Sequence, residues 1–437
     1  MTVDLSRFRN AVATARDIIP VGAVTRVIGL VIEGDGPDVP VGSMCKIFPR
    51  EAGQPVEAEV VGFRDGRILM MPLATPQGIS PRCRIEAIRG KATVSVDETI
   101  LGRVLDGLGR PLDGKGALKC RHEMPLYAEP VNPVGRKRIS QPLDLGIRAI
   151  NGLLTCGRGQ RIGIMAGTGV GKSVLLGMMA KLTNADVAVI GFIGERGREV
   201  REFIEKNLGE EGMKRSVLVT ATSDNTPLVR LRAAYTATAI AEYFRKQGKD
   251  VLLMLDSLTR FAMAQREIGL SIGEPPATKG YTPSVFALLP RLLERAGTGG
   301  EEEGSITGLY TVLVEGDDLS EPISDASRAI LDGHIILSRA LAARGHYPAI
   351  DVLQSISRVM IDVTPREQMA LAKKLFRTLS IYKEAEDLIN IGAYVKGSNP
   401  AIDDAIQRIG AINAFLEQGM DERSSLEESV RKMAEIF

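Results

Sequence analysis

The eight residues Ala-Gly-Thr-Gly-Val-Gly-Lys-Ser at 166–173 constrain this chain more than any other feature. The apolar run 161–165 precedes them and the helical pattern 174–180 follows, which predicts a strand, a glycine-rich turn and a helix in that order. Such a turn points successive backbone N–H groups inward, where they cradle the β-phosphate of a nucleotide at the helix N-terminus. Lys172 is then expected to neutralise the β- and γ-phosphates, and the Ser173 hydroxyl to ligate Mg²⁺.

This segment departs from the strict phosphate-loop pattern at one position. Ala166 stands where G-x-x-x-x-G-K-[ST] has its first glycine, and a small residue still fits there. The alternative interpretation is an ordinary glycine-rich turn between a strand and a helix. The predicted nucleotide-binding residues are Gly167, Thr168, Gly169, Val170, Gly171, Lys172, Ser173 and Val174.

Bulk composition excludes several classes of protein. A chain of 437 residues is too long for one core and predicts two or three domains. A net charge of +1 and the absence of Trp disfavour a nucleic-acid or membrane binder. No signal peptide or membrane-spanning run is apparent. Four widely spaced cysteines form no metal-ligand pattern and are expected to be free thiols, so we expect a cytoplasmic protein.

The first part of the chain is predicted to hold a small β-barrel. Residues 1–18 combine an apolar stripe with arginines, typical of an amphipathic docking helix, or alternatively of a leader that docks on its own domain. Residues 19–98 contain short β-type runs between turn residues, which favours a barrel. These runs are 24–32, 56–63, 67–71 and 92–96. Residues 99–140, with several Gly and Pro, are expected to form an ordered linker.

The rest of the chain is predicted to be an α/β domain followed by helices. Within 141–361, apolar β-branched runs alternate with helical patterns, which indicates a mostly parallel sheet covered on both faces. The runs are 187–192, 216–220, 251–255 and 308–314. Residues 362–437 have a helical pattern, with Leu371, Leu375 and Leu379 on one face.

Two apolar strands are followed by carboxylates. Asp256 directly follows the run 251–255 and is positioned to hold Mg²⁺, usually through water. On its own, such a residue is more often a helix N-cap. Glu195 ends another strand, where it could polarise the attacking water. Arg196 and Arg260 are candidates to orient that carboxylate, and the alternative is a surface salt-bridge cluster.

Phosphoryl transfer also favours a cation that enters the site from outside. Arg358 lies near the end of the α/β section, but by itself it has the appearance of any surface arginine.

These motifs, in this order, resemble the catalytic subunit of rotary ATP synthases. The resemblance spans essentially the whole chain and implies a β-barrel, a RecA-like nucleotide domain and a helical C-terminal domain. The segments that carry it are Gly-Val-Gly-Lys at 169–172, Gly-Glu-Arg at 194–196, the strand ending at Asp256 with Ser-Leu-Thr-Arg at 257–260, and 347–358.

Within that superfamily, several stretches resemble the flagellar protein-export ATPases. They are 169–179, 273–286, 288–297 and 329–339. Similar strings occur in the injectisome (virulence type III secretion) ATPases, but Val170, the run after Ser173 and the segment 391–400 are more similar to the flagellar version.

The resemblance implies a role for each site residue. Glu195 would be the catalytic carboxylate, Asp256 the Mg²⁺ acidic residue, and Arg358 a finger reaching into a neighbouring subunit's site. Tyr347 would stack on the adenine, where the alternative is a buried tyrosine at a strand start. The cofactors implied are ATP and Mg²⁺, and activity would require a ring, a homohexamer.

The resemblance also implies partners and a location. We expect a stator-like regulator at residues 1–18 and a coiled-coil stalk protein in the central pore, which the loop 277–282 would face. An export gate membrane protein and chaperone–substrate complexes complete the set, with no nucleic acid. The enzyme would energise export of flagellar subunits and their release from chaperones, peripheral to the inner face of the cytoplasmic membrane.

Four other functions compete with this interpretation. They are an injectisome ATPase, a rotary synthase subunit, a non-catalytic ring subunit and an RNA helicase. Glu195 argues against the non-catalytic subunit, because such subunits in the rotary family typically carry Gln there. The expected barrel lacks the interleaved aromatics and basic stripe of a helicase that binds RNA.

Overall fold

The computed structural model describes residues 20–51, 53–88 and 92–437, which form two compact units. The first unit holds the described residues up to Ala92 together with Ile268–Glu274, and the second holds Thr93–Glu267 and Pro275–Phe437. The expected docking helix at 1–18 lies outside the described residues.

The first unit contains a closed six-stranded barrel, as predicted, with strand order β1-β2-β5-β4-β3-β6. Its core is apolar, with Ile32, Val60 and Met70 fully buried. The run 24–32, expected as one strand, is two antiparallel strands because the chain reverses at Gly29, whose φ of 55° suits glycine. The strands are β1 (Val21–Ile28), β2 (Val31–Asp35), β3 (Met44–Phe48), β4 (Val56–Arg64), β5 (Arg67–Pro72) and β6 (Arg84–Ile88).

The second unit begins earlier in the chain than the sequence indicated. β7 (Thr93–Val96), expected in the barrel, pairs instead with β9 (His122–Pro125). β8 (Val104–Asp106), in the expected linker, pairs in parallel with β14 (Ser216–Thr222) and so extends the central sheet. The helix α6 (Pro227–Lys246) packs on both β7 and β9, which explains why these two short strands belong to this unit.

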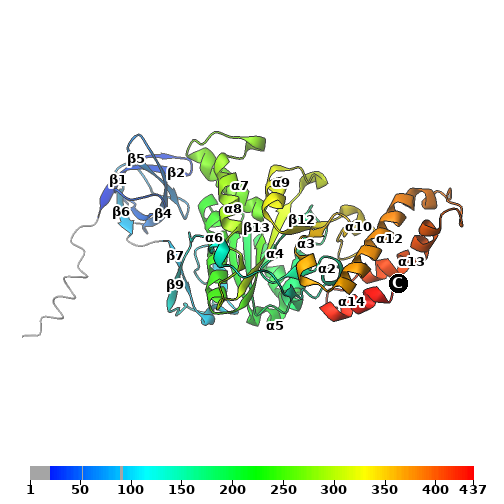
Figure 1. The fold of residues 1–437 in the computed structure, drawn as a ribbon. Coiled ribbons are helices and arrows are strands. Elements are labelled where there is room, and N and C mark those ends of the chain that lie inside the picture. Colours follow the sequence, from blue (N-terminus) through cyan, green and yellow to red (C-terminus); the bar gives the residue numbers. More distant parts are fainter. Residues whose placement is uncertain (1–19, 52, 89–91) are drawn as a thin grey trace, which may run out of the picture. The chain divides into compact units, whose positions relative to one another are not determined.

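A nine-stranded sheet forms the centre of the second unit, with order β19-β18-β12-β17-β15-β13-β14-β8 and β16 paired to β17 (Figure 1). Its strands are parallel except β16 and β19, which confirms the predicted mostly parallel sheet. The remaining strands are β12 (Arg161–Ala166), β13 (Val187–Glu195), β15 (Asp250–Asp256), β16 (Gly297–Thr298), β17 (Ser305–Leu313), β18 (Gly333–Leu337) and β19 (Ile356–Ser357). A separate two-stranded sheet joins β10 (Pro142–Leu143) and β11 (Cys156–Gly157).

Helices connect these strands and complete the α/β part of the unit. They are α2 (Arg148–Leu153), α3 (Lys172–Leu182), α4 (Gly197–Glu202), α5 (Gly209–Lys214), α7 (Leu258–Ser271), α8 (Pro283–Leu293), α9 (Pro322–Ile330) and α10 (Arg339–Ala343). One turn of π-helix (Phe203–Leu208) continues α4 and packs against α3. Among the described residues, no helix is long and apolar enough to cross a membrane.

The chain ends in a helical section, as predicted, which is drawn in orange and red in Figure 1. Its helices are α11 (Met360–Val363), α12 (Arg366–Asn390), α13 (Pro400–Leu416) and α14 (Leu426–Ala434). α12 packs on α13, and α14 packs on α2. The buried guanidinium of Arg148 on α2 donates to the carbonyls of Phe415, at 2.8 Å, and Glu417. Because the last carbonyls of a helix lack partners within it, this arginine caps the C-terminus of α13.

Candidate nucleotide site

Within the segment 166–173, residues 167–171 form a tight loop between β12 and α3. Gly169 and Gly171 have φ of 81° and 88°, in the left-handed region that glycine adopts without strain. A Cβ added to Gly167 would lie 2.8 Å from Nη2 of Arg339. The positive φ at Gly169 and Gly171 therefore favours glycine, whereas the exposed end of Arg339 can move away from position 167, and α3 begins with Lys172 directly after the loop.

Three charged side chains from separate elements meet beside this loop. Asp256 ends β15 and Glu195 ends β13, its neighbour in the sheet. Nζ of Lys172 contacts Oδ1 of Asp256 and lies 4.0 Å from Oε1 of Glu195. The parallel strands bring these side chains together because their carboxyl ends share one edge of the sheet.

Glu195 is a buried carboxylate with an unsatisfied oxygen. Its residue is 8% exposed, and Oε1 has no hydrogen-bond partner. Burial and then the neighbouring Asp256 carboxylate raise the pKa of Glu195 to about 7, against the opposing effect of Lys172. A carboxyl that is poised near neutral pH and lacks a partner is suited to accept a hydrogen bond or a proton from a substrate water.

The residues at the site have the chemistry that Mg²⁺ requires. The Asp256 carboxylate and the Ser173 hydroxyl are hard oxygen donors, which this ion prefers. Among the described residues, no group of three or more His, Cys, Asp or Glu side chains could hold a metal. A Mg²⁺ ion that binds together with a nucleotide needs only one or two protein ligands, since phosphate oxygens and waters complete its shell.

The two arginines expected to orient Glu195 have different positions. Arg260 is close enough for its charge to lower the pKa of Glu195, and its buried Nε lacks a hydrogen-bond partner. The Arg196 side chain is 83% exposed, and its closest acid is Glu199 at 3.9 Å. A Cβ added to Gly194 would lie 3.1 Å from Cβ of Arg260, so Arg260 packs against the residue that precedes Glu195, whereas the Arg196 side chain is exposed.

Tyr347 lies beside the phosphate loop. A Cβ added to Gly171 would be 3.3 Å from Cε1 of its ring. The residue is 45% exposed, so the ring is not the buried tyrosine of the alternative interpretation. Its backbone carbonyl accepts a 2.9 Å hydrogen bond from the N–H of Gln418, just beyond α13.

Arg358 is remote from the phosphate loop of its own chain. Its backbone N–H donates to the carbonyl of Asp332 at 3.0 Å, and the Asp332 carboxylate pairs with Arg161, the first residue of β12. The phosphate loop follows Ala166, the last residue of that strand. Arg358 and the loop therefore lie at opposite ends of β12.

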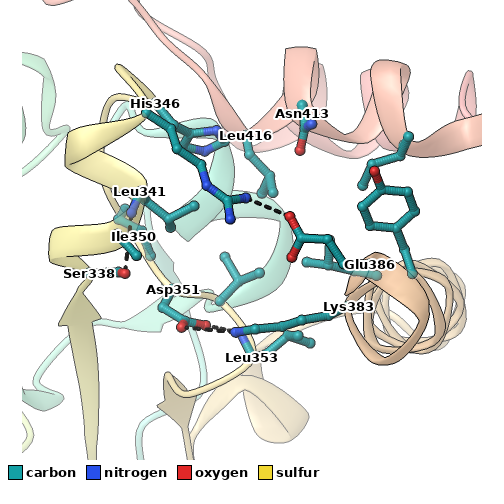
Figure 2. Close-up of a pocket in the computed structure, with 16 residues that line it drawn as sticks. Ser338, Leu341, His346, Ile350, Asp351, Leu353, Lys383, Glu386, Asn413 and Leu416 are labelled. Carbon is teal, nitrogen blue, oxygen red and sulfur yellow. Dashed lines mark hydrogen bonds and ion pairs between the residues drawn. The ribbon is translucent and has the colours of Figure 1, made fainter. Parts of the chain in front are cut away.

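A cavity of about 160 Å³ adjoins the segment that carries Tyr347, between α10 and the helices α12 and α13 (Figure 2). Lys383 and Asp351 point toward each other across it and are 3.5 Å apart. His346 lines this cavity, but no residue of the phosphate loop does. It is thus a separate space between the α/β part and the C-terminal helices.

Sequence reasoning missed two residues that contact the site. The Asn207 side chain donates to the carbonyl of Ser173 at 3.1 Å, and the Thr311 hydroxyl donates to Oδ1 of Asp256 at 2.6 Å. Neither lies in a motif. Thr311 could have been noticed as the hydroxyl residue inside the apolar run 308–314.

Comparison with known proteins agrees with this geometry. Residues 146–357 match the model of the ATP synthase alpha/beta family, nucleotide-binding domain, and residues 364–435 match the T3SS EscN ATPase C-terminal domain. The chain is 52% identical to a flagellum-specific ATP synthase of Pseudomonas aeruginosa, over 99% of this chain and 96% of the relative. It is 54% identical to that of Bacillus subtilis (95% and 94% covered) and 50% identical to a type 3 secretion system ATPase of Sinorhizobium fredii (95% and 92%).

Solved structures give the same result. The assembled ATPase EscN from the enteropathogenic E. coli type III secretion system superimposes with a TM-score of 0.90 at 43% identity, covering 95% of this chain and 99% of that one. EscN in complex with its central stalk EscO gives a TM-score of 0.87 at the same identity and coverage. The chain therefore belongs to the family of flagellum-specific ATP synthases and type 3 secretion system ATPases, and it is a P-loop ATPase.

Proposed function

We propose that this protein hydrolyses Mg-ATP to energise export of flagellar subunits and their release from chaperones. The observation that carries the proposal is the meeting of Lys172, Glu195 and Asp256 beside the phosphate loop. The flagellar assignment is supported by relatives named flagellum-specific ATP synthase at 52% and 54% identity.

Each residue of the site has a distinct task in this proposal. Lys172 leaves Asp256 and turns to the β- and γ-phosphates when the nucleotide binds. Ser173 and Asp256 hold Mg²⁺, which supplies charge neutralisation at the phosphates. Glu195 orients the attacking water and accepts its proton, while Arg260 stabilises the ionised carboxylate. Tyr347 stacks on the adenine.

Replacing Glu195 with Gln tests this proposal. The Glu195→Gln variant keeps the shape of the side chain but removes the base, so turnover should fall at least ~10²-fold while Mg-ATP still binds. ATPase assays and binding of a fluorescent nucleotide measure the two effects. Glu205→Gln, which changes an exposed carboxylate just beyond α4, is the matched control and should retain turnover. Near-normal turnover in the Glu195 variant would sink the assignment.

A homohexameric ring is part of this proposal. Arg358 lies at the opposite end of β12 from its own phosphate loop, so as a finger it has to serve a neighbouring subunit. EscN, a relative at 43% identity, has been solved as an assembled ATPase and with a central stalk. By analogy, the loop 277–282 faces a coiled-coil stalk in the central pore.

The remaining partners follow from the export role. The enzyme acts in the cytoplasm at the inner face of the membrane, where it meets the export gate and chaperone–substrate complexes. The apolar stripe Leu5, Phe8 and Val12 docks a stator-like regulator. Arginines contribute ~1 kcal/mol each toward anionic lipid, a binding that salt abolishes, whereas an apolar groove contact survives salt.

Truncation tests the docking segment. Deleting residues 1–18 should leave nucleotide binding intact but end co-purification with the regulator in moderate salt. Leu5→Asp or Phe8→Asp should have the same effect, and Arg7→Ala should matter less because the contact is apolar. Continued co-purification of the truncated protein would show that another surface docks the regulator.

An injectisome ATPase is the second candidate, favoured by the type 3 secretion relative at 50% identity. Disruption of the gene distinguishes the two. Loss of flagellar filaments with intact respiration supports the flagellar role, and loss of effector secretion supports the injectisome.

A further inference from the structure

Thr311 is a buried hydroxyl residue in the centre of the sheet. Its strand, β17, runs between β12, which leads into the phosphate loop, and β15, which ends at Asp256. Thr311 pairs with Ile164 of β12, and the preceding residue, Tyr310, pairs with Leu255 of β15. Thr311 is 0% exposed. A hydroxyl buried among apolar strands lowers stability unless it is hydrogen-bonded, so its bond has to account for its presence.

The Thr311 hydroxyl has two acceptors within reach. Oγ1 lies 2.6 Å from Oδ1 of Asp256 and 3.3 Å from the carbonyl oxygen of Leu255. The hydroxyl has one proton, and the shorter contact to a carboxylate is the stronger bond. Thr311 therefore donates to Asp256.

Lys172 contacts the same oxygen, Oδ1 of Asp256. When Lys172 turns to the phosphates of a bound nucleotide, Asp256 loses that partner. Thr311 lies on a central strand of the sheet and stays in place. The bond from Thr311 then keeps Oδ1 fixed, so that the carboxylate that would hold the cation keeps one orientation.

We propose that Thr311 is a positioning residue that orients the Asp256 carboxylate for Mg²⁺ once Lys172 has moved to the nucleotide. This proposal rests on the Mg²⁺ role of Asp256 given above. It predicts that the Thr311 hydroxyl affects nucleotide binding only through the metal.

Binding of a fluorescent ADP analogue, titrated with Mg²⁺ and repeated in EDTA, tests this prediction. Thr311→Val keeps the shape and removes the hydroxyl, and it should raise the Mg²⁺ concentration for half-maximal binding about tenfold, as expected for loss of a charged hydrogen bond. Binding in EDTA should stay within about twofold of wild type. Thr311→Ser restores the hydroxyl and should restore the Mg²⁺ dependence.

Thr307→Val is the matched control. Thr307 is also buried on β17, but its hydroxyl accepts from the N–H of Gly159, at the other end of the strand. Loss of the Thr307 hydroxyl should lower the free energy of unfolding without changing the Mg²⁺ dependence of nucleotide binding. Three results would overturn the proposal. They are a wild-type Mg²⁺ dependence in Thr311→Val, no rescue by Thr311→Ser, and the same shift in Thr307→Val. If the Val variant does not fold, Thr311→Ala is titrated in the same way.

Asp256→Asn separates this proposal from the function on which it rests. If this variant loses the Mg²⁺ dependence and Thr311→Val keeps it, only the role of Thr311 is wrong. If Asp256→Asn itself keeps the wild-type dependence, the assignment of Asp256 to Mg²⁺ fails, and the role of Thr311 fails with it.

Discussion

At the scale of single residues, the site holds two buried carboxylates and one lysine that lies near both. Glu195 and Asp256 are both buried, and Lys172 is the cation that contacts both. Burial and the Asp256 carboxylate raise the pKa of Glu195, and Lys172 lies closer to Asp256, which leaves Oε1 of Glu195 without a hydrogen bond. The nucleotide-free protein thus carries an electrostatic cost where the phosphates and cation are expected to bind.

This cost predicts how stability depends on pH. The pKa of Glu195 rises from an ordinary 4.5 to about 7 on folding. Its stabilising contribution is fully present below pH 4.5 and is lost as pH rises through 7, when the folded protein has to hold the ionised form. Glu195→Gln is neutral at every pH. The difference in free energy of unfolding between this variant and wild type should therefore favour the variant more at pH 8 than at pH 5, by on the order of 1 to 3 kcal/mol.

Thermal melting of nucleotide-free protein at pH 5 and pH 8 measures this difference. Glu205→Gln changes an exposed carboxylate that pairs with Arg201, and this variant should melt with the pH profile of wild type. An equal difference between Glu195→Gln and wild type at both pH values would show that Glu195 titrates normally.

At the scale of elements, Arg148 shows how one side chain joins the C-terminal helices to the α/β part. Its guanidinium donates to carbonyls at the end of α13 and pairs with Glu422, while its backbone N–H donates to Gln418 at 2.7 Å. Gln418 also donates its backbone N–H to Tyr347. The end of α13 is thereby tied to the segment beside the phosphate loop.

Removing this cap should loosen the C-terminal helices. Arg148→Met leaves buried carbonyls without donors and should lower the free energy of unfolding by on the order of 3 kcal/mol. Hydrogen exchange of α13 and the melting temperature measure the loss. Arg423→Met removes a mostly exposed arginine that pairs with Asp144 at 3.5 Å and should change little. Equal exchange in α13 of both variants would mean that the cap is dispensable.

The sequence predicts elements well where the pattern is local. The long apolar runs became β13, β14, β15 and β17, and the glycine-rich residues 167–171 became the loop before α3. β8 was missed because a three-residue strand among Gly and Pro has no periodicity, and its pairing with β14 is settled only by the folded sheet. Arg196 and Arg260 look equivalent in sequence. In the structure Arg196 follows β13 with an exposed side chain, whereas Arg260 lies on α7 and packs against Gly194, next to Glu195.

At the scale of the whole molecule, the phosphate loop and Arg358 lie at opposite ends of β12. If one subunit's arginine completes the next subunit's site, every interface is head-to-tail, and a closed ring is the arrangement that leaves no site incomplete.

The position of Arg358 therefore predicts that the rate of ATP hydrolysis depends on assembly of the ring. Activity per subunit should rise with protein concentration, and Arg358→Ala should lose ~10³-fold in turnover while still binding nucleotide. Sedimentation and ATPase assays on the same dilution series measure both quantities. Arg328→Ala, a neighbour whose carbonyl accepts from Arg358, is the control. Activity per subunit that stays constant down to monomer would refute the role in trans.

The pairing of β8 with β14 has a consequence for where this protein can be divided. β8 is the terminal strand on its side of the sheet, and it covers the backbone groups of β14. A fragment that starts at residue 141 lacks β8 and presents β14 as a bare, apolar edge, which is a template for aggregation. The second unit begins at Thr93, so a fragment that keeps the catalytic sheet intact has to include residues 93–140. This segment protects the edge of β14 and belongs with the catalytic part.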